Sequence, residues 1–155
     1  MKLFLKNLIF VLVVPGTVGV YIPLLLADGR HIASGPILYL SMVLLVTGAI
    51  VCGWCVMDFA IIGRGTPAPI DAPKKLVVRG PYRYVRNPMY MGVLTVLVGW
   101  AVMFRWVHLM FYTVLVWTVN HLFVVLYEEP HLRRQFGDEY IDYCKKVGRW
   151  LPRFP

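Results

Sequence analysis

The fold is decided by residues 88–129, PMYMGVLTVLVGWAVMFRWVHLMFYTVLVWTVNHLFVVLYEE. This stretch consists of two apolar runs, 88–104 and 106–127, which Arg105 separates. Each run reaches or approaches the roughly 20 residues that a helix needs to cross a bilayer. The stretch therefore predicts a helical hairpin in a membrane.

Two polar segments border this hairpin. The segment GPYRYVRNPMY, at 80–90, leads into the first run, and the acidic pair Glu128 and Glu129 closes the second. Because the two helices run in opposite directions, both polar segments come to the same membrane face. A site can be assembled there.

The composition predicts an integral membrane protein of the all-α class. Of the 155 residues 59% are hydrophobic, against roughly 45–50% in soluble domains, and the mean hydropathy is +0.65. Two further apolar runs lie at about 7–26 and 36–62. We expect a single membrane domain, 1–155, built as a bundle of four transmembrane helices. The length of the 36–62 run leaves five open.

The basic residues orient this bundle, because Lys and Arg collect in cytoplasmic loops. With four spans, fourteen of the 16 basic residues fall on one side, and only Arg30 and Arg105 fall on the other. Both termini are therefore expected in the cytoplasm, and the compact chain suggests a bacterial inner membrane. The net charge of +8 is explained by orientation and by contact with anionic membrane lipids. A nucleic acid partner is not expected, because the basic residues border apolar runs.

The ends of the hairpin helices carry recognisable signals. Asn87 is a favoured N-cap residue, and Pro88 suits the first helical position. The helix therefore starts with its positive dipole end at the cytoplasmic face, which suits an anion. At the other end Pro130 should stop the second helix, because its ring clashes with the carbonyl four residues back.

A cytoplasmic tail is predicted to follow Pro130. Its apolar residues recur at spacings of three and four, which is typical of an amphipathic helix, and they are Leu132, Phe136, Tyr140, Tyr143 and Val147. Gly137 and Asp138 should divide it into two short helices along the membrane interface. We divide the domain into N-terminal transmembrane helices, 1–62, and a cofactor-binding hairpin with this tail, 76–155.

The acidic pair is the first candidate for chemistry. Two carboxylates at the negative end of a helix repel each other and need a compensating partner. Glu128 and Glu129 can cap the next helix or pair with Arg133 and Arg134, or they can hold a cation or a polar ligand. His121, on the same helical face as Glu128, is a candidate because ionisable residues within spans are costly.

The start of the hairpin supplies the complementary groups. Arg86 and Tyr90 share a helical face, and a guanidinium can hold a carboxylate or a phosphate with two hydrogen bonds. Each residue also has a plain explanation, a snorkelling arginine and a tyrosine of the interfacial aromatic belt. No metal is expected. Cys52 and Cys55 have no second pair, and Glu128-x-x-His131 lacks the second copy that a di-iron site requires.

The chain resembles a known enzyme family. Three blocks carry the resemblance: RNPMYMG at 86–92, the pair Glu128–Glu129, and a tail with Leu132, Phe136–Gly137, Tyr140, Tyr143 and Arg149-Trp150-x-Pro152. Together, over about residues 76–155, they resemble the isoprenylcysteine carboxyl methyltransferase family, which groups with phospholipid N-methyltransferases. The resemblance implies an S-adenosylmethionine-dependent enzyme with a lipophilic acceptor, most simply carboxyl O-methylation of an isoprenylcysteine-like substrate.

The resemblance and the local chemistry together assign roles to residues. The candidates for catalysis are Arg86, Glu128 and Glu129. The candidates for cofactor binding are Tyr84, Asn87, Pro88, Tyr90, His121, Glu128 and Glu129. The candidates for substrate binding are Arg86, Arg149 and Arg153.

One departure from the family shapes the expected mechanism. The histidine of the family block is Asn87 here, and an amide cannot accept a proton at neutral pH. A carboxylate acceptor tolerates this loss, because it is already ionised and needs mainly alignment. A phospholipid amine acceptor would need a base, and a glutamate is the obvious one. Two other functions fit the pattern of apolar runs and polar segments, namely a membrane reductase that uses a nicotinamide cofactor and a non-enzymatic scaffold or assembly protein.

Overall fold

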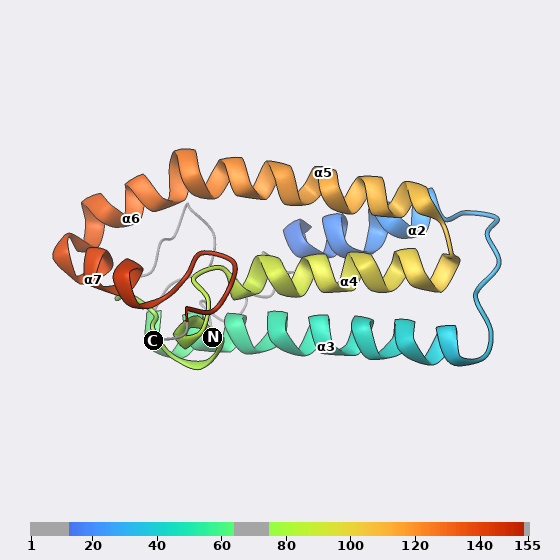
Figure 1. The fold of residues 1–155 in the computed structure, drawn as a ribbon, viewed down its shortest axis with the longest axis horizontal. Helices are drawn as coiled ribbons and strands as arrows, with labels where there is room; N and C mark the ends of the chain where they lie inside the picture. The colour runs from blue at the N-terminus through green and yellow to red at the C-terminus, as the bar shows by residue number, and fades with distance from the viewer. Residues whose placement is uncertain (1–12, 64–74, 154–155) are drawn as a thin grey trace.

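The computed structural model describes residues 13–63 and 75–153, and within them it confirms the all-α class. The α-helices are α2 (Ile22–Leu26), α3 (Pro36–Asp58), α4 (Pro88–Phe104), α5 (Val107–Phe123), α6 (Glu129–Phe136) and α7 (Asp138–Lys146). Short π-helical turns, η1 (Thr17–Tyr21), η2 (Phe59–Gly63) and η5 (Val124–Glu128), extend them, and η4 (Gly80–Arg83) is a 3-10 turn. Figure 1 shows α3, α4 and α5 as long rods lying along one another.

Two helices are long and apolar enough to cross a membrane. They are Pro36–Gly63 and Val107–Phe136. Val13–Leu26 and Pro88–Phe104 are apolar but shorter, and the first part of the run predicted at 7–26 lies outside the described residues. The run at 36–62 forms one continuous helix. The count of four spans stays a prediction.

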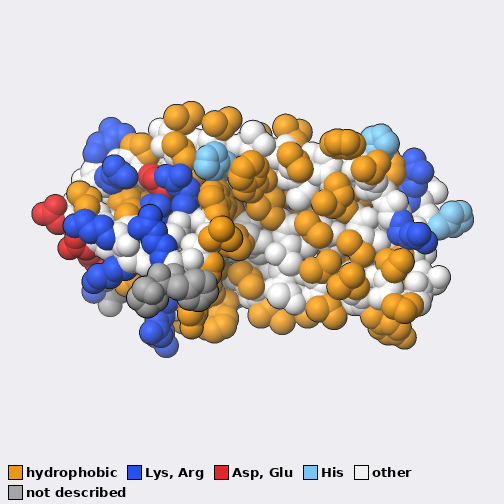
Figure 2. Space-filling model, in the orientation of Figure 1, with side chains coloured by type: hydrophobic (Ala, Val, Ile, Leu, Met, Phe, Trp, Pro, Cys, Tyr) orange, Lys and Arg blue, Asp and Glu red, His pale blue; other side chains and the backbone are white. Residues whose placement is uncertain are grey.

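The surface is divided in the way that a membrane protein requires. Figure 2 shows hydrophobic side chains over the middle of the molecule. Lys and Arg side chains gather at the end that carries α6 and α7, and a smaller basic and His-containing group lies at the opposite end. This distribution matches the uneven charge split that the sequence predicts.

The prediction that Pro130 stops the second hairpin helix is wrong. The helix continues from Val107 to Phe136, through the proline (Figure 1). The π-helical turn η5 explains how: the Glu129 N–H reaches back five residues to the Val124 carbonyl, which widens the turn just before the proline. A wider turn relieves the clash that an α-helical proline makes with the preceding carbonyls.

A π-helical turn also accommodates Pro23. The Ile22 N–H bonds the Thr17 carbonyl, five residues back, and Pro23 has no N–H to donate. The carbonyls of Val18 and Gly19 therefore lose their helical donors. They accept hydrogen bonds from the Tyr112 hydroxyl at 3.0 Å and from the Trp100 indole at 2.9 Å, respectively. These bonds satisfy backbone groups inside an apolar region and join helix 13–26 to α4 and α5.

The helices α3 and α4 are in close contact through glycines. A Cβ atom at Gly48 would lie 2.6 Å from the Gly92 carbonyl oxygen, and one at Gly92 would lie 2.7 Å from Cys52 Sγ. Small residues let membrane helices approach this closely. The contact aligns the C-terminal end of α3 with the start of α4, where the first polar segment lies.

The tail divides at Gly137, as the sequence predicts, but its apolar face is used within the protein. Gly137 adopts a φ of +54°, and α7 begins at Asp138. Tyr140, Tyr143 and Val147 are buried and pack with Leu76. The Tyr143 hydroxyl donates to the Tyr82 carbonyl at 2.7 Å. The tail therefore packs on the segment before α4 and does not turn these residues toward lipid.

We expect Gly48→Ala to destabilise the protein by about 1–3 kcal/mol, because the added methyl group overpacks a tight contact. Gly53, further along α3, is exposed, and a Cβ atom there would meet open space. Gly53→Ala should be neutral or stabilising by up to about 1 kcal/mol, since Ala favours a helix. Thermal unfolding in detergent measures both. Equal melting temperatures for the two variants would contradict the close α3–α4 contact.

Candidate functional site

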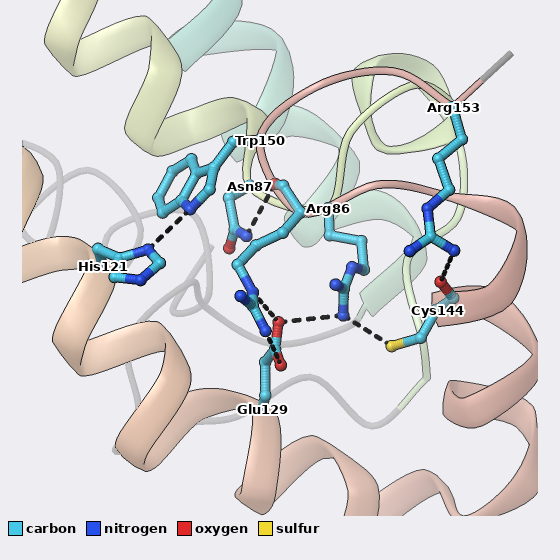
Figure 3. A network of polar contacts seen from close by, with 8 residues as sticks. Arg86, Asn87, His121, Glu129, Cys144, Trp150 and Arg153 are labelled. Atoms are coloured by element: carbon cyan, nitrogen blue, oxygen red, sulfur yellow. Dashed lines mark hydrogen bonds and ion pairs between the residues drawn. The ribbon is translucent and has the colours of Figure 1, made fainter.

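Glu129 is the centre of a polar network between three segments. The residue is 5% exposed. Its Oε1 accepts a hydrogen bond from Arg149 Nε at 2.7 Å, and its Oε2 accepts one from Arg149 Nη2 at 2.9 Å. Arg86 Nη1 lies 3.0 Å from Oε1. One carboxylate thus holds two guanidinium groups, one from the start of α4 and one from the tail (Figure 3).

The Arg86 side chain makes a second polar contact, on the side away from Glu129. Its Nη1 also donates to Cys144 Sγ at 2.8 Å, and its side chain is 9% exposed. Figure 3 shows the guanidinium between Glu129 and Cys144. Its Nε is buried and has no hydrogen-bond partner in the described part of the protein. A donor of this kind is costly to bury unless something accepts from it.

Glu128 has surroundings of a different kind. The Tyr90 hydroxyl donates to its Oε2 at 2.9 Å, which joins the first turn of α4 to the end of η5. Neither glutamate pairs with Arg133 or Arg134 in the ion pairs of the described residues. The local pairing that the sequence left open is therefore not the arrangement found. The two neighbouring carboxylates serve separate contacts.

Asn87 occupies the N-cap position of α4, and Pro88 follows in the first turn. The predicted N-cap position is confirmed, but the Asn87 side chain makes no capping hydrogen bond. Its Nδ2 donates to the Arg149 carbonyl oxygen at 3.1 Å. The amide is turned toward the tail, where it finds an acceptor that a single-helix pattern cannot reveal.

His121 is joined to the tail as well. Trp150 Nε1 donates to His121 Nδ1 at 3.0 Å (Figure 3). The Trp150 ring also meets Tyr90 edge-on, with the ring centroids 6.4 Å apart. The tryptophan thus lies between α5 and α4.

Two cavities adjoin this network, of about 810 Å³ and about 650 Å³ including space open to solvent. Both are lined by Phe59, Tyr82, Arg86, Asn87, Tyr90 and Glu128. We call these six residues the shared wall.

The two cavities differ in their remaining walls. The first, here the aromatic cavity, continues along η5, α6 and α7, past Phe123, Tyr127, Glu129, His131, Tyr140 and Tyr143. The second, here the apolar cavity, continues toward helix 13–26, past Val14, Pro15, Val18, Met89, Val93 and Asn120. One cavity therefore faces the tail, and the other faces the apolar helices.

The remaining predicted site residues lie further out. Tyr84, 65% exposed, Pro88, His121, Arg149 and Arg153 do not line either cavity in the described residues. Arg153 Nη1 donates to the backbone carbonyls of Cys144 and Lys145, at 3.3 and 3.0 Å. Sequence reasoning missed Tyr82 and Cys144 as site residues; Tyr82 lies within the first polar segment, whereas nothing in the sequence signalled Cys144.

Three ionisable groups near Glu129, namely Tyr140, Tyr143 and Arg149, keep their ordinary charge states at neutral pH. Hydrogen bonding to Glu129 raises the pKa of Arg149, so its guanidinium stays charged. Burial raises the pKa of Tyr140 and of Tyr143, so both hydroxyls stay protonated. In the part of the chain that the structure describes, no cluster of His, Cys, Asp or Glu is suited to a metal ion.

Comparison with known proteins places this geometry in context. A family model described as phospholipid methyltransferase matches residues 36–139. A probable protein-S-isoprenylcysteine O-methyltransferase of Oryza sativa subsp. indica is 38% identical over 79 residues, which are 50% of this chain and 41% of that protein. Protein-S-isoprenylcysteine O-methyltransferase B of Arabidopsis thaliana is 35% identical over 81 residues, 50% of this chain and 40% of that protein.

The chain thus spans about two fifths of the length of these plant relatives. An uncharacterized protein of Haemophilus influenzae is 31% identical over 67 residues, which are 41% of this chain and 100% of that protein. The similarity to this bacterial protein therefore covers it from end to end.

We expect Glu129→Gln to destabilise the protein by about 3 kcal/mol, because two guanidinium groups lose their buried counter-charge. Glu139→Gln removes the same charge from an exposed position in the first turn of α7 and serves as the matched control. Its expected cost is within about 0.5 kcal/mol. The measurement is thermal unfolding in detergent. A Glu129→Gln protein as stable as the control would show that the network contributes little to the fold.

Proposed function

We propose the following function for this chain, which belongs to the phospholipid methyltransferase family: it transfers a methyl group from S-adenosylmethionine to a lipophilic acceptor at the cytoplasmic membrane interface. The observation that carries the proposal is the shared wall. It places Arg86, Tyr90 and Glu128 between an aromatic cavity beside the tail and an apolar cavity beside the helices. A methyltransferase with one polar and one lipophilic ligand needs two such compartments that meet.

The proposed topology is a four-helix membrane domain with the tail in the cytoplasm of a bacterial cell. The helices Pro36–Gly63 and Val107–Phe136 have the required length, and the basic end in Figure 2 carries α6 and α7. In this orientation the site lies at the cytoplasmic surface. A soluble ligand then enters from the water and a lipophilic one from the bilayer.

The aromatic cavity suits S-adenosylmethionine. When bound, this molecule supplies an electrophilic methyl group on a sulfonium centre. The rings of Tyr82, Tyr90 and Tyr127 can face the sulfonium through cation–π attraction. Glu128 can accept hydrogen bonds from the amino group or the ribose hydroxyls, and the unpartnered Nε of Arg86 can donate to the carboxylate of the same molecule or to an acceptor anion.

The apolar cavity suits the lipophilic acceptor. Val14, Val18 and Val93 offer hydrocarbon surface on helix 13–26 and α4, so the chain of an isoprenoid or a fatty acyl group can replace lipid there. Its polar end would then lie at the shared wall. A carboxylate at that place needs no base, because it is already ionised, and Arg86 can align it.

The two glutamates receive different roles in this proposal. Glu128 touches both cavities and is assigned to ligand binding and, for a protonated acceptor, to proton removal. Glu129 is engaged by Arg86 and Arg149 and is assigned to positioning these residues. The proposal thus separates two carboxylates that the sequence pattern makes equal candidates for catalysis.

A phospholipid amine is the second candidate acceptor. Two observations favour it: the description of the matching family model and the placement of the Glu128 carboxylate at the shared wall. A carboxylate there can attract an ammonium group and take its proton. The plant relatives, whose names describe O-methylation of isoprenylcysteine, favour the carboxylate.

We expect S-adenosylhomocysteine to bind the purified protein in detergent, measured by isothermal titration calorimetry. Glu128→Gln should weaken binding about ten-fold or more, because a hydrogen bond to a charged group contributes roughly 1.5–3 kcal/mol. Glu139→Gln is the control and should bind like the wild type. Absence of binding by the folded wild-type protein would sink the proposed function. Equal affinity of Glu128→Gln and the control would remove Glu128 from the ligand site.

We expect transfer of a labelled methyl group to an S-farnesylated cysteine with a free carboxylate, and no transfer to its methyl ester. Phosphatidylethanolamine vesicles form the amine arm of the assay. Alkali releases methanol from a carboxyl ester but leaves an N-methyl group in place, so it identifies the product. If the label is stable to alkali and appears only with the vesicles, the acceptor is the phospholipid amine and the proposed carboxylate acceptor is wrong.

A further inference from the structure

Asn87 makes an unusual use of its side chain. It is 5% exposed and lies at the shared wall. Nδ2 is directed at the main chain of the tail, where it donates to the Arg149 carbonyl oxygen at 3.1 Å. A buried amide donor is placed by its acceptor, and here the acceptor belongs to a segment 62 residues away in sequence.

The tail segment, residues 147–151, is held in place by contacts that its consecutive residues make with other parts of the protein. The Gly148 carbonyl accepts from the Arg86 N–H at 2.8 Å, in a bridge that pairs Gly148 with Val85. Trp150 donates to His121. A Cβ atom at Gly148 would clash with the Leu151 carbonyl, so the tight turn of the segment requires this glycine.

Arg149 is fixed at both of its ends. Its guanidinium makes two hydrogen bonds to Glu129, and its carbonyl accepts from Asn87. Because the backbone of Arg149 is held, its side chain approaches Glu129 from one direction. Loss of the Asn87 donor frees this peptide unit and leaves a partly buried carbonyl without its partner.

We propose that Asn87 is a positioning residue that holds the tail segment against the start of α4, and that it supports cofactor binding through this contact. The inference rests on the proposed function for its second half. Asn87 keeps Arg149 on Glu129, so Glu128 remains the carboxylate that faces ligands. The role needs a side-chain donor and no proton acceptor, which is why an amide suffices here.

Hydrogen exchange of the full-length protein in detergent, without ligand, tests the first half. We expect amides of residues 147–151 to exchange about five- to ten-fold faster in Asn87→Ala, and faster still in Asn87→Asp, whose carboxylate cannot donate and repels the carbonyl. Asn87→His, which keeps a ring donor, should restore slower exchange. Thr118→Ala, which removes an exposed hydroxyl group from α5 outside both cavities, is the control and should match the wild type. Peptides from α3 show whether the fold persists.

Calorimetric titration of the same variants with S-adenosylhomocysteine tests the second half. We expect affinity to fall about five- to ten-fold in Asn87→Ala and to recover in Asn87→His. Unchanged exchange of the tail segment in Asn87→Ala overturns the proposal, and weakened affinity beside it would indicate direct contact with the ligand. If the wild type binds no S-adenosylhomocysteine, the proposed function fails, whereas the exchange of the tail segment still decides the positioning role.

Discussion

The structure depends on one buried carboxylate. Glu129 accepts from Arg149 through two hydrogen bonds and pairs with Arg86, so it joins α6, the start of α4 and the tail. Removing a carboxylate from water is costly, and two cations with well-placed donors offset the cost. The partners come from distant parts of the chain. The network therefore exists only when the hairpin and the tail have both folded.

The helical frame supplies the geometry that this network needs. Gly48 and Gly92 let α3 and α4 approach closely, and the freed carbonyls beside Pro23 bind Trp100 and Tyr112. These contacts lie in the apolar part of the molecule, where unsatisfied backbone groups are expensive. They hold the helix ends at one level, and the polar groups of the site converge there.

The sequence predicted the elements better than their contacts. Apolar run lengths predicted the hairpin, and proline chemistry correctly placed Pro88 in the first turn of α4. The same chemistry failed at Pro130, because a π-helical turn changes the hydrogen-bond pattern before the proline. The partners of Glu129 also could not be predicted from the sequence. Spacing rules reveal neighbours on one helix, such as Arg133, whereas Arg86 and Arg149 meet Glu129 only in three dimensions.

The π-helical turn η5 affects how independently the two parts of its helix can change in sequence. Each residue of an α-helix turns the chain by about 100°, so a turn that holds one extra residue shifts the phase of everything after it by roughly that angle. The side chains of α5 and α6 therefore follow two different angular registers within one continuous helix. Under the proposed function, lipid contacts constrain the first register and ligand chemistry constrains the second. Substitutions that adapt the protein to another bilayer can therefore accumulate on α5 without turning the carboxylates of the site.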